Sequence, residues 1–386
     1  MTSMSYAEFD LTDHQTGAET ARNGGGMATI YDVAKAAGVS AKTVSRVMNG
    51  DGPVGAATRT AVEQAMQDLG FVRSNAARMM RAQKSGLIGL ITGAISNVVG
   101  VANPSGLPDL FILQGLQRAF QQSGMTLMIA DTGGHSDRVA PLIQTFLQHR
   151  VEGLIYVAGY HQKVVLPKMP ASVPLVLANC FDDIGTPCIL PDDQRGQHDL
   201  VTRILAAGHR RIAYLTLRSV IVATRLRTAG YRAALDAAGI KFDADLVQDC
   251  DLEEHEGETQ LLWDAIDRML NLPDPPTTFC CGNDKMALKA YGILRSRGLK
   301  VPAEISVAGY DNYRVIAETL YPPLTTVELP YAAMGVRAAQ RLLAMISGEN
   351  PEDHGPTIVS GPVYWRDSVT ETRRSTITQL KTVREE

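Results

Sequence analysis

Features that indicate a catalytic site are missing from this sequence of 386 residues. It has no G-x-G-x-x-G loop after a predicted strand, no G-x-x-x-x-G-K-[ST] loop for phosphates, no G-x-S-x-G nucleophile elbow and no H-E-x-x-H zinc motif. His255-Glu256 is followed by Gly-Glu-Thr, so the second histidine of that motif is missing. The eight histidines are scattered and are expected at the surface or at helix caps. We therefore expect a protein that is not an enzyme and that needs neither a metal nor a cofactor.

Cysteine and long apolar runs are also scarce. The five cysteines form no C-x-x-C pair, and such a scattered, odd-numbered set is typical of packing residues in a reducing cytoplasm. No apolar run approaches the length of about 18 residues that a membrane span needs. In place of a positive segment followed by an apolar one, the N-terminal region carries Glu8, Asp10, Asp13 and Glu19. We expect a cytoplasmic protein with neither a signal peptide nor a membrane span.

Charge is distributed unevenly along the chain. The net charge is -4, but residues 27–83 contain seven lysines and arginines against four acids, which leaves -7 elsewhere. With 45% hydrophobic residues, the chain can bury the cores of two or three domains. A basic head on an acidic body suits a phosphate backbone, and an ordinary solvated helical surface would show the same balance.

The N-terminal region predicts a leader followed by three short helices. Residues 1–26 are polar, end in Asn-Gly-Gly-Gly and are expected to be disordered. The first helix is expected over 30–37, capped by Thr29 and ended by Gly38; the second runs from Ser40 to about Met48, and the third covers 57–69. A small core is expected from Val33, Ala34, Ala37, Val39, Val44, Val47 and Val62.

Beyond a basic link, short apolar runs alternate with amphipathic helices. The expected strands are 87–92, 126–130, 153–157, 175–178, 212–216, 278–281 and 306–308. The expected helices are 111–123, 138–149, 196–207, 225–238 and 285–297. Alternating strands and helices predict parallel sheets with crossover helices, here in two lobes. A ligand is then expected beyond the carboxyl ends of the strands, in the cleft between the lobes.

The second of the three N-terminal helices has a face of hydrogen-bond donors. No aspartate or glutamate occurs between Val39 and Gly50, which is unusual for a solvated surface in a plain three-helix bundle. In a helix-turn-helix, such a helix lies in the major groove, where arginine reads guanine and alanine contacts a thymine methyl group. The expected DNA contacts are Ala41, Lys42, Thr43, Ser45, Arg46 and Asn49.

The segments TIYDVAKAAGVSAKTVSRVMNG and TRTAVEQAMQDLGF resemble the headpiece of the lactose- and galactose-repressor (LacI/GalR) family of bacterial transcriptional regulators. Similar motifs continue in the expected order through GHRRIAYLT, RLRTAGYRAAL, GNDKMAL, GLKVPAEISVAGYDN and PPLTTVELPYAAMG. The resemblance implies an all-α helix-turn-helix headpiece joined to an α/β domain like a periplasmic binding protein, with two Rossmann-like lobes. It also implies a homodimer that represses transcription at a pseudo-palindromic operator.

The resemblance also implies a hinge helix between headpiece and body. Its positions match Ser74–Arg81, too few residues for a stable isolated helix. Met80 stands at the position of the apolar wedge that opens a base step in the minor groove, and Arg78 and Arg81 are expected on phosphates. Arg73-Ser74 replaces the Pro-Asn common in the family, so the entry into the helix differs.

The resemblance carries three effector contacts onto Arg227, Asn283 and Asp311, which suit paired hydrogen bonds to sugar hydroxyls. Each has a structural alternative: Asn283 as a helix cap, Asp311 in a turn, and Arg225 as a competing arginine. The first lobe departs from the family pattern by an apparent insertion at 98–107. Further expected wall residues are Phe111, Asn179, Asp131 and Tyr160, and core packing is an equal expectation for Phe111.

These observations predict a leader (1–26), a DNA-binding domain (27–73), a hinge (74–85), an effector-binding and dimerisation domain (86–371) and a tail (372–386). Lobe 1 is expected at 86–190 and 328–350, and lobe 2 at 191–327 and 351–371. The expected function is a regulator controlled by a small molecule, with a sugar or oligosaccharide preferred. The alternatives are a purine- or other metabolite-responsive corepressed regulator, or a solute-binding protein; the last would need an export signal and no basic head.

Overall fold

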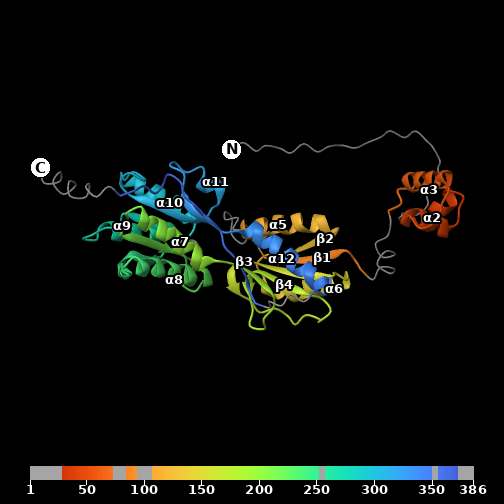
Figure 1. Cartoon of the computed structure of the whole chain (residues 1–386), viewed down its shortest axis with the longest axis horizontal. Coiled ribbons are helices and arrows are strands. Elements are labelled where there is room, and N and C mark those ends of the chain that lie inside the picture. Colours follow the sequence, from red (N-terminus) through yellow and green to blue (C-terminus); the bar gives the residue numbers. More distant parts are fainter. Residues whose placement is uncertain (1–27, 73–83, 94–106, 252–256, 350–354, 373–386) are drawn as a thin grey trace, which may run out of the picture. The chain divides into compact units, whose positions relative to one another are not determined.

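The computed structural model describes residues 28–72, 84–93, 107–251, 257–349 and 355–372. The chain divides into two compact units, 1–83 and 84–386. The second unit contains two sheets with helices on their faces (Figure 1). The predicted leader and most of the predicted hinge and tail lie outside the described residues, as does nearly all of the apparent insertion at 98–107.

The first unit is a three-helix headpiece. It contains α1 (Ile30–Ala36), α2 (Ala41–Asn49) and α3 (Ala56–Asp68). Thr29 and Asp32 form a capping box on α1, and the Ser40 hydroxyl accepts a hydrogen bond from the Thr43 amide at 3.1 Å, which begins α2. The predicted helices and caps are confirmed to within a residue or two at each end. Fully buried Val33, Val44 and Val62 join the three helices in one core.

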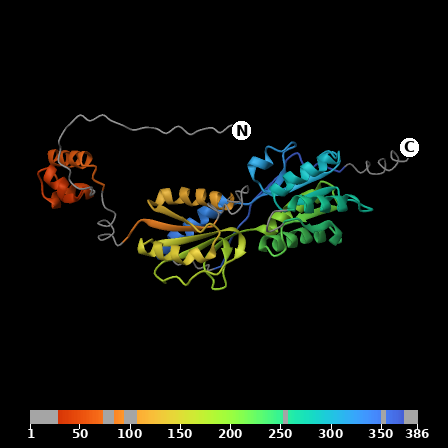
Figure 2. The ribbon, with the colours of Figure 1, turned by 180° about the vertical axis from the view of Figure 1, so that it is seen from behind.

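Lobe 1 of the second unit is built on a parallel sheet in the order β11-β5-β4-β3-β1-β2. Figures 1 and 2 show α5 (Leu107–Ser123) and α12 (Tyr331–Ile346) side by side on this lobe. Its strands are β1 (Leu87–Thr92), β2 (Thr126–Asp131), β3 (Gly153–Lys163), β4 (Leu175–Phe181), β5 (Cys188–Pro191) and β11 (Thr357–Val359). The 3-10 turn η1 (Ser136–Arg138) and the helix α6 (Val139–Gln148) connect β2 to β3.

Lobe 2 is built on a second sheet in the order β12-β10-β9-β8-β6-β7, in which only β12 runs antiparallel to its neighbour among the described strands. Its strands are β6 (Ile212–Thr216), β7 (Val247–Asp249), β8 (Thr278–Cys281), β9 (Ser306–Asp311), β10 (Thr325–Glu328) and β12 (Val363–Tyr364). Its helices are α7 (Asp193–Ala206), α8 (Val222–Ala237), α9 (Glu258–Leu270), α10 (Asp284–Ser296) and α11 (Arg314–Ala317), with a 3-10 turn η2 (Ala244–Leu246). The prediction of a two-lobed α/β domain is confirmed.

The chain passes between the lobes at three places. It leaves lobe 1 after β5, returns after β10, and leaves again between β11 and β12. The third passage differs from the expected boundary at 350, because β11 at 357–359 pairs in parallel with β5 of lobe 1. The expectation placed 351–371 wholly in lobe 2. A strand of only three residues, Thr357–Val359, is too short for its hydrophobic pattern to indicate which sheet it joins.

Three strands continue at least three residues beyond their predicted ends at the cleft side: β3, β9, and β4, which continues from Ala178 to Phe181. β3 was expected to stop at Val157, but it runs on to Lys163 across a shift of register against β4 between Val157 and Gln162. β9 continues from Ala308 to Asp311. Bulged and terminal residues break the alternation on which a strand prediction depends. All five cysteines are buried, as expected for packing residues. In the described part of the chain, no helix has the length and apolar character that a membrane crossing requires.

Glycines allow two pairs of helices to pack closely. A methyl group at Gly230 of α8 would lie 2.1 Å from the Gln194 carbonyl oxygen of α7, and one at Gly115 of α5 would lie 2.0 Å from the Ala332 carbonyl oxygen of α12. Both carbonyls belong to helix backbone, which cannot move as a side chain can. α7 and α8 are the helices that carry the charged side chains described below, so their spacing determines the geometry of those side chains.

Gly230→Ala is therefore expected to lower the free energy of unfolding by about 1–3 kcal/mol, the usual cost of overpacking. Gly292 on α10 is the matched control, since it is exposed and a methyl group there would contact nothing within 4 Å. Gly292→Ala should stabilise the chain by about 0.5–1 kcal/mol, because alanine loses less backbone entropy. Thermal unfolding followed by circular dichroism measures both, and shifts of equal sign would contradict this account.

Candidate functional sites

The outer face of α2 carries two exposed basic side chains one turn apart. Lys42 and Arg46 are exposed, while Val44 and Val47 on the opposite face are buried. Ser40 caps the N-terminus, and Gly50 ends the helix with a φ of +69°. No acid lies on the helix to neutralise this face. Residues four apart share one side of a helix, so both cations can enter one groove of a duplex together.

The other predicted DNA contacts are half-buried and engage one another locally. The Thr43 hydroxyl lies 2.9 Å from the Ser40 hydroxyl, and the Asn49 amide donates to the Ser45 hydroxyl at 3.4 Å. Ala41 packs partly against the headpiece core. Lys42 and Arg46 are thus the residues of this set whose side chains are most open to a partner. The predicted hinge contacts Arg78, Met80 and Arg81 lie outside the described residues.

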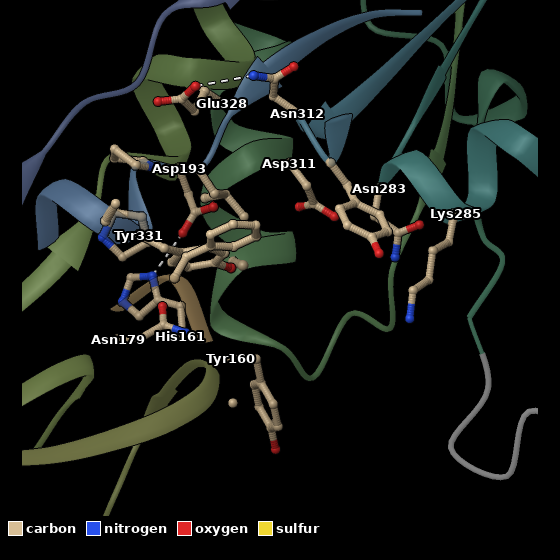
Figure 3. A pocket seen from close by; sticks show the side chains of 18 of the residues that line it. Tyr160, His161, Asn179, Asp193, Asn283, Lys285, Asp311, Asn312, Glu328 and Tyr331 are labelled. Carbon is tan, nitrogen blue, oxygen red and sulfur yellow. Dashed lines mark hydrogen bonds and ion pairs between the residues drawn. The ribbon is translucent and has the colours of Figure 1, made fainter. Parts of the chain in front are cut away.

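The second unit contains a cavity of about 740 Å³ whose walls come from both lobes (Figure 3). Lobe 1 contributes Phe111, Tyr160, His161 and Asn179, together with Tyr331 at the start of α12. Lobe 2 contributes the polar side chains Asp193, Arg227, Asn283, Lys285 and Asp311. The volume falls within the range of about 300–1,000 Å³ that is usual for small-molecule sites. Apolar walls with a few convergent polar groups are the usual character of such sites.

Arg227 is the fixed cation of this cavity. The residue is only 4% exposed, and its Nε donates to Asp193 Oδ1 at 2.7 Å while Nη1 donates to the Gly282 carbonyl at 2.8 Å. One face of the guanidinium lies 3.7 Å from the centre of the Tyr310 ring. A guanidinium has five N–H donors, so the remaining ones can bind a ligand in a fixed orientation.

Asp193 holds Arg227 on one oxygen and His161 on the other. Its side chain is fully buried, and Oδ2 lies 2.8 Å from His161 Nδ1. Burial alone would raise the pKa of this carboxyl group, but the Arg227 charge and the hydrogen bonds from both partners bring the pKa below its ordinary value. The carboxylate is therefore ionised and compensates the charge of the arginine.

Asn179 presents an unpaired acceptor at the cavity wall. Its side chain is 1% exposed, and its amide donates to the Ala158 carbonyl at 3.0 Å. The oxygen Oδ1 is buried and has no hydrogen-bond partner among the residues that the structure describes. A buried polar atom without a partner costs about 1–3 kcal/mol. A ligand that donates a hydrogen bond to this oxygen would remove that cost.

Asn283 and Asp311 stand at the ends of β8 and β9, as predicted. Asn283 Oδ1 accepts from the Met286 amide at 2.7 Å and caps α10, so the capping alternative is true and the residue still lines the cavity. Burial raises the pKa of Asp311 to about 7, with a further contribution from the charge of Asp193. Burial, with the charge of Asp311 next, also raises the pKa of Asp284, whose carboxyl accepts from Thr326 at 2.6 Å.

The structure gathers six of the seven predicted effector residues around this cavity. Arg227, Asn283 and Asp311 line it together with Phe111, Asn179 and Tyr160. Asp131 is not among its lining residues; at the end of β2 it accepts a hydrogen bond from the Gly133 amide at 3.1 Å. The competitor Arg225 is exposed and donates to the Val220 carbonyl at 3.2 Å, away from the cavity wall.

Sequence reasoning missed Asp193 and His161, the two residues that fix Arg227. Asp193 follows Asp192, which caps α7, and a second acid there carries no further signal. His161 lies in the part of β3 beyond the predicted end. The prediction of Arg227 at the site did imply such a partner, because a buried arginine requires an acid close enough to form an ion pair. Positive φ angles at Asn179, Asp311 and Asn312 also mark the cavity, since non-glycine residues adopt them rarely and often at functional sites.

A helix-turn-helix unit with a basic outer face and a two-lobed unit with a ligand cavity define a class: DNA-binding regulators that sense a small molecule. Residues 29–74 match the family described as bacterial regulatory proteins, lacI family, and residues 201–369 match a periplasmic binding protein-like domain. The chain belongs to the lacI family. It is a transcriptional repressor whose binding to operator DNA is controlled by an effector.

Relatives with known roles support this assignment over nearly their whole length. The ribose operon repressor of Escherichia coli K12 is 32% identical over 325 residues, covering 83% of this chain and 94% of the relative. The sucrose operon repressor of Escherichia coli is 32% identical over 327 residues, covering 82% and 94%. Among solved structures, the Lac repressor dimer bound to operator and the anti-inducer ONPF has a TM-score of 0.70 at 28% identity, covering 89% of this chain and 99% of that one.

The raised pKa of Asp311 predicts how stability changes with pH. Asp311 in the unfolded chain ionises near pH 4, whereas in the folded chain it keeps its proton up to about pH 7. At this residue the unfolded state therefore binds fewer protons in this window, so the contribution of Asp311 to the stability of the folded chain should fall as the pH rises from about 4 to about 7. In Asp311→Asn, the free energy of unfolding should lack the decrease with pH that Asp311 contributes in the wild type.

Urea unfolding across this window, with Asp137→Asn as an exposed aspartate control, provides the measurement. The Asp137 variant should follow the wild-type profile, because its side chain is exposed on lobe 1. An Asp311→Asn profile parallel to the wild type would show that this carboxyl group ionises normally in the folded chain.

Proposed function

We propose that the effector of this repressor is an uncharged carbohydrate that binds between the two lobes. The observation that carries the proposal is the pairing of Arg227 with Asp193 at 2.7 Å. This pair leaves guanidinium donors for hydroxyl groups while cancelling the charge that would attract a free anion. Asn179 Oδ1 offers an unpaired acceptor from the facing lobe. A sugar hydroxyl both donates and accepts hydrogen bonds, so it can bind the donors of Arg227 on one wall and the acceptor of Asn179 on the other.

The size and the apolar parts of the wall favour a sugar larger than a single ring. A cavity of about 740 Å³ lined by Phe111, Tyr160 and Tyr331 leaves room beside the polar cluster for a second ring or an apolar substituent. Aromatic side chains offer flat apolar surfaces for the faces of such rings. The relatives named for ribose and sucrose support the carbohydrate class but differ in sugar size. A purine is the competing flat ligand and forms part of the test below.

The DNA-binding form is proposed to be a homodimer. Lobe 2 exposes apolar side chains that its own fold does not cover: Leu288 on α10 is 46% exposed and Tyr321 is 93% exposed. The two belong to adjoining segments, since the Tyr291 hydroxyl donates to the Pro322 carbonyl at 3.0 Å. Exposed apolar surface of this kind is typical of protein interfaces. The solved Lac repressor is described as a dimer on its operator, which supports the same assembly here.

In this mechanism, the dimer presents two α2 helices to successive major grooves, with the segments at 74–81 in the minor groove between them. Effector binding across the cavity favours one angle between the lobes, and that shift changes the population of the DNA-binding arrangement. A ligand moves this equilibrium only through its difference in affinity for the two arrangements. The direction of the change distinguishes an inducer from a corepressor.

The proposal is tested by measuring operator binding with and without ribose, sucrose, cellobiose, gluconate and hypoxanthine. The operator is first recovered by selection from randomised duplexes with the full chain. One neutral sugar should change operator affinity about 5- to 150-fold, the usual range of allosteric coupling. A response to gluconate or hypoxanthine alone would overturn the neutral-sugar assignment, and the absence of any response would overturn sugar control.

A variant at the cavity wall connects that response to the site. Asn179→Gly should weaken binding of the active sugar about tenfold, because the acceptor is lost while glycine keeps the φ of +60°. Asp131→Gly is the matched control, since Asp131 is not among the residues that line the cavity. Equal losses in both variants would assign the sugar to a different site.

Arg46 is expected to determine part of the base preference. Arg46→Ala should cost about 1–3 kcal/mol against the preferred base and relax the preference at one position of each half-site. Lys35→Ala is the control, because Lys35 is an exposed cation in the last turn of α1 and lies outside α2. Selection from randomised duplexes with each variant gives the measurement. An unchanged site preference in Arg46→Ala would show that another face reads the bases.

A further inference from the structure

A chain of three buried side chains, His161, Asp193 and Arg227, crosses from lobe 1 to lobe 2 beside the cavity, and Figure 3 shows its contact between His161 and Asp193. His161 belongs to β3 of lobe 1, Asp193 begins α7, and Arg227 lies on α8 of lobe 2. Asp193 bridges them with one carboxylate oxygen for each partner, at 2.8 Å to His161 Nδ1 and 2.7 Å to Arg227 Nε. The orientation of the lobe 2 arginine thus depends on a carboxylate that is also bound to lobe 1.

The remaining supports of Arg227 all belong to lobe 2. Nη1 donates to the Gly282 carbonyl, and the Tyr310 ring lies under the guanidinium. The Tyr310 hydroxyl donates to the Asp193 carbonyl oxygen at 3.3 Å, which fixes the main chain of Asp193 but leaves its carboxylate to the two side-chain partners. His161 is therefore the lobe 1 group that restrains rotation of this carboxylate.

Local structure directs His161 toward the link. The register between β3 and β4 shifts between Val157 and Gln162, and such bulges redirect a side chain relative to the regular strand. The imidazole packs edge-to-face against Phe181 of β4, with ring centres 5.9 Å apart. It is held by lobe 1 on this side and by Asp193 on the other, and its exposure is only 5%.

We propose that His161 is a positioning residue for the effector site: by donating to Asp193, it orients the Arg227 guanidinium across the boundary between the lobes. The importance of this link for regulation rests on the proposed binding role of Arg227, but the link itself is a property of the ligand-free chain. Separating the lobes would break the contact between His161 and Asp193 while leaving the pair within lobe 2. The link therefore makes the geometry of the arginine depend on the angle between the lobes.

The link also determines which hydrogen bond His161 can offer a ligand. An ionised Asp193 accepts, so Nδ1 of His161 carries the proton of this hydrogen bond. His161 and Asn179 both line the cavity, where Asn179 Oδ1 is the acceptor that lobe 1 presents. Arg227 on lobe 2 presents only donors. The link thus favours an effector whose hydroxyl groups donate toward lobe 1 and accept from lobe 2.

The test uses the full ligand-free chain labelled with ¹⁵N-arginine. The Arg227 Nε–H signal, assigned by its loss in Arg227→Lys, should exchange slowly with water in the wild type. In His161→Phe, which keeps the ring packing, exchange should become about tenfold faster, the effect of one lost hydrogen bond. His161→Asn should restore slow exchange, because its amide can donate from the position of Nδ1. His149→Phe, at an exposed histidine of the same lobe, should leave the signal unchanged.

A second measurement follows the proton on His161 by its ¹⁵N shifts. The wild type should show the tautomer with the proton on Nδ1, which is the less common one in water. Asp193→Asn should lose this preference, whereas a merely structural histidine would keep its tautomer. An Arg227 signal unchanged in His161→Phe, or an Nδ1 without a proton in the wild type, would overturn the link. Failure of every sugar in the panel would overturn the proposed effector and leave these two results standing.

Discussion

The buried pair of Asp193 and Arg227 is the interaction on which the effector unit depends. Transferring either charge alone from water to this interior would cost several kcal/mol, so neither residue is tolerable without the other. The two approach within 2.7 Å because α7 and α8 pack at a distance that only glycine at position 230 permits. The ion pair of the site therefore depends on the close packing of two helix backbones. The same ion pair holds the N–H donors of the Arg227 guanidinium in a fixed orientation at the cavity.

This arrangement explains why the cavity can hold strain and unsatisfied groups. Asn179, Asp311 and Asn312 have positive φ angles, and the first of these also leaves a buried oxygen without a partner. Each costs of the order of 1–3 kcal/mol and persists only when the surrounding structure enforces it. Here the enforcing structure is two sheets with fully buried cores. The fold thus has several small unfavourable free-energy contributions at the cavity, and a ligand that binds there can remove one of them, the cost of the unpaired Asn179 oxygen.

The sequence was informative wherever a local pattern determines the structure. The caps at Thr29 and Ser40 predicted α1 and α2 because capping depends on residues within one turn. It was uninformative where the outcome depends on residues distant in sequence. Asp193 and Arg227 are 34 positions apart, and His161 acquires its role through a bulge that breaks the strand pattern. The membership of β11 in lobe 1 likewise depends on its pairing with β5, not on its three residues.

Asn283 shows how capping and binding functions can coincide in one side chain. Its oxygen begins α10, so the helix would lose a cap without it, and its residue lines the cavity at the end of β8. In a parallel sheet, strand ends and helix starts meet at the same edge, so a residue that begins a helix there also faces the ligand. A cap of this kind fixes the side chain before any ligand arrives, and less rotational freedom is lost on binding. The alternatives for Asn283 were therefore never exclusive, because the fold that requires the cap also directs it to the site.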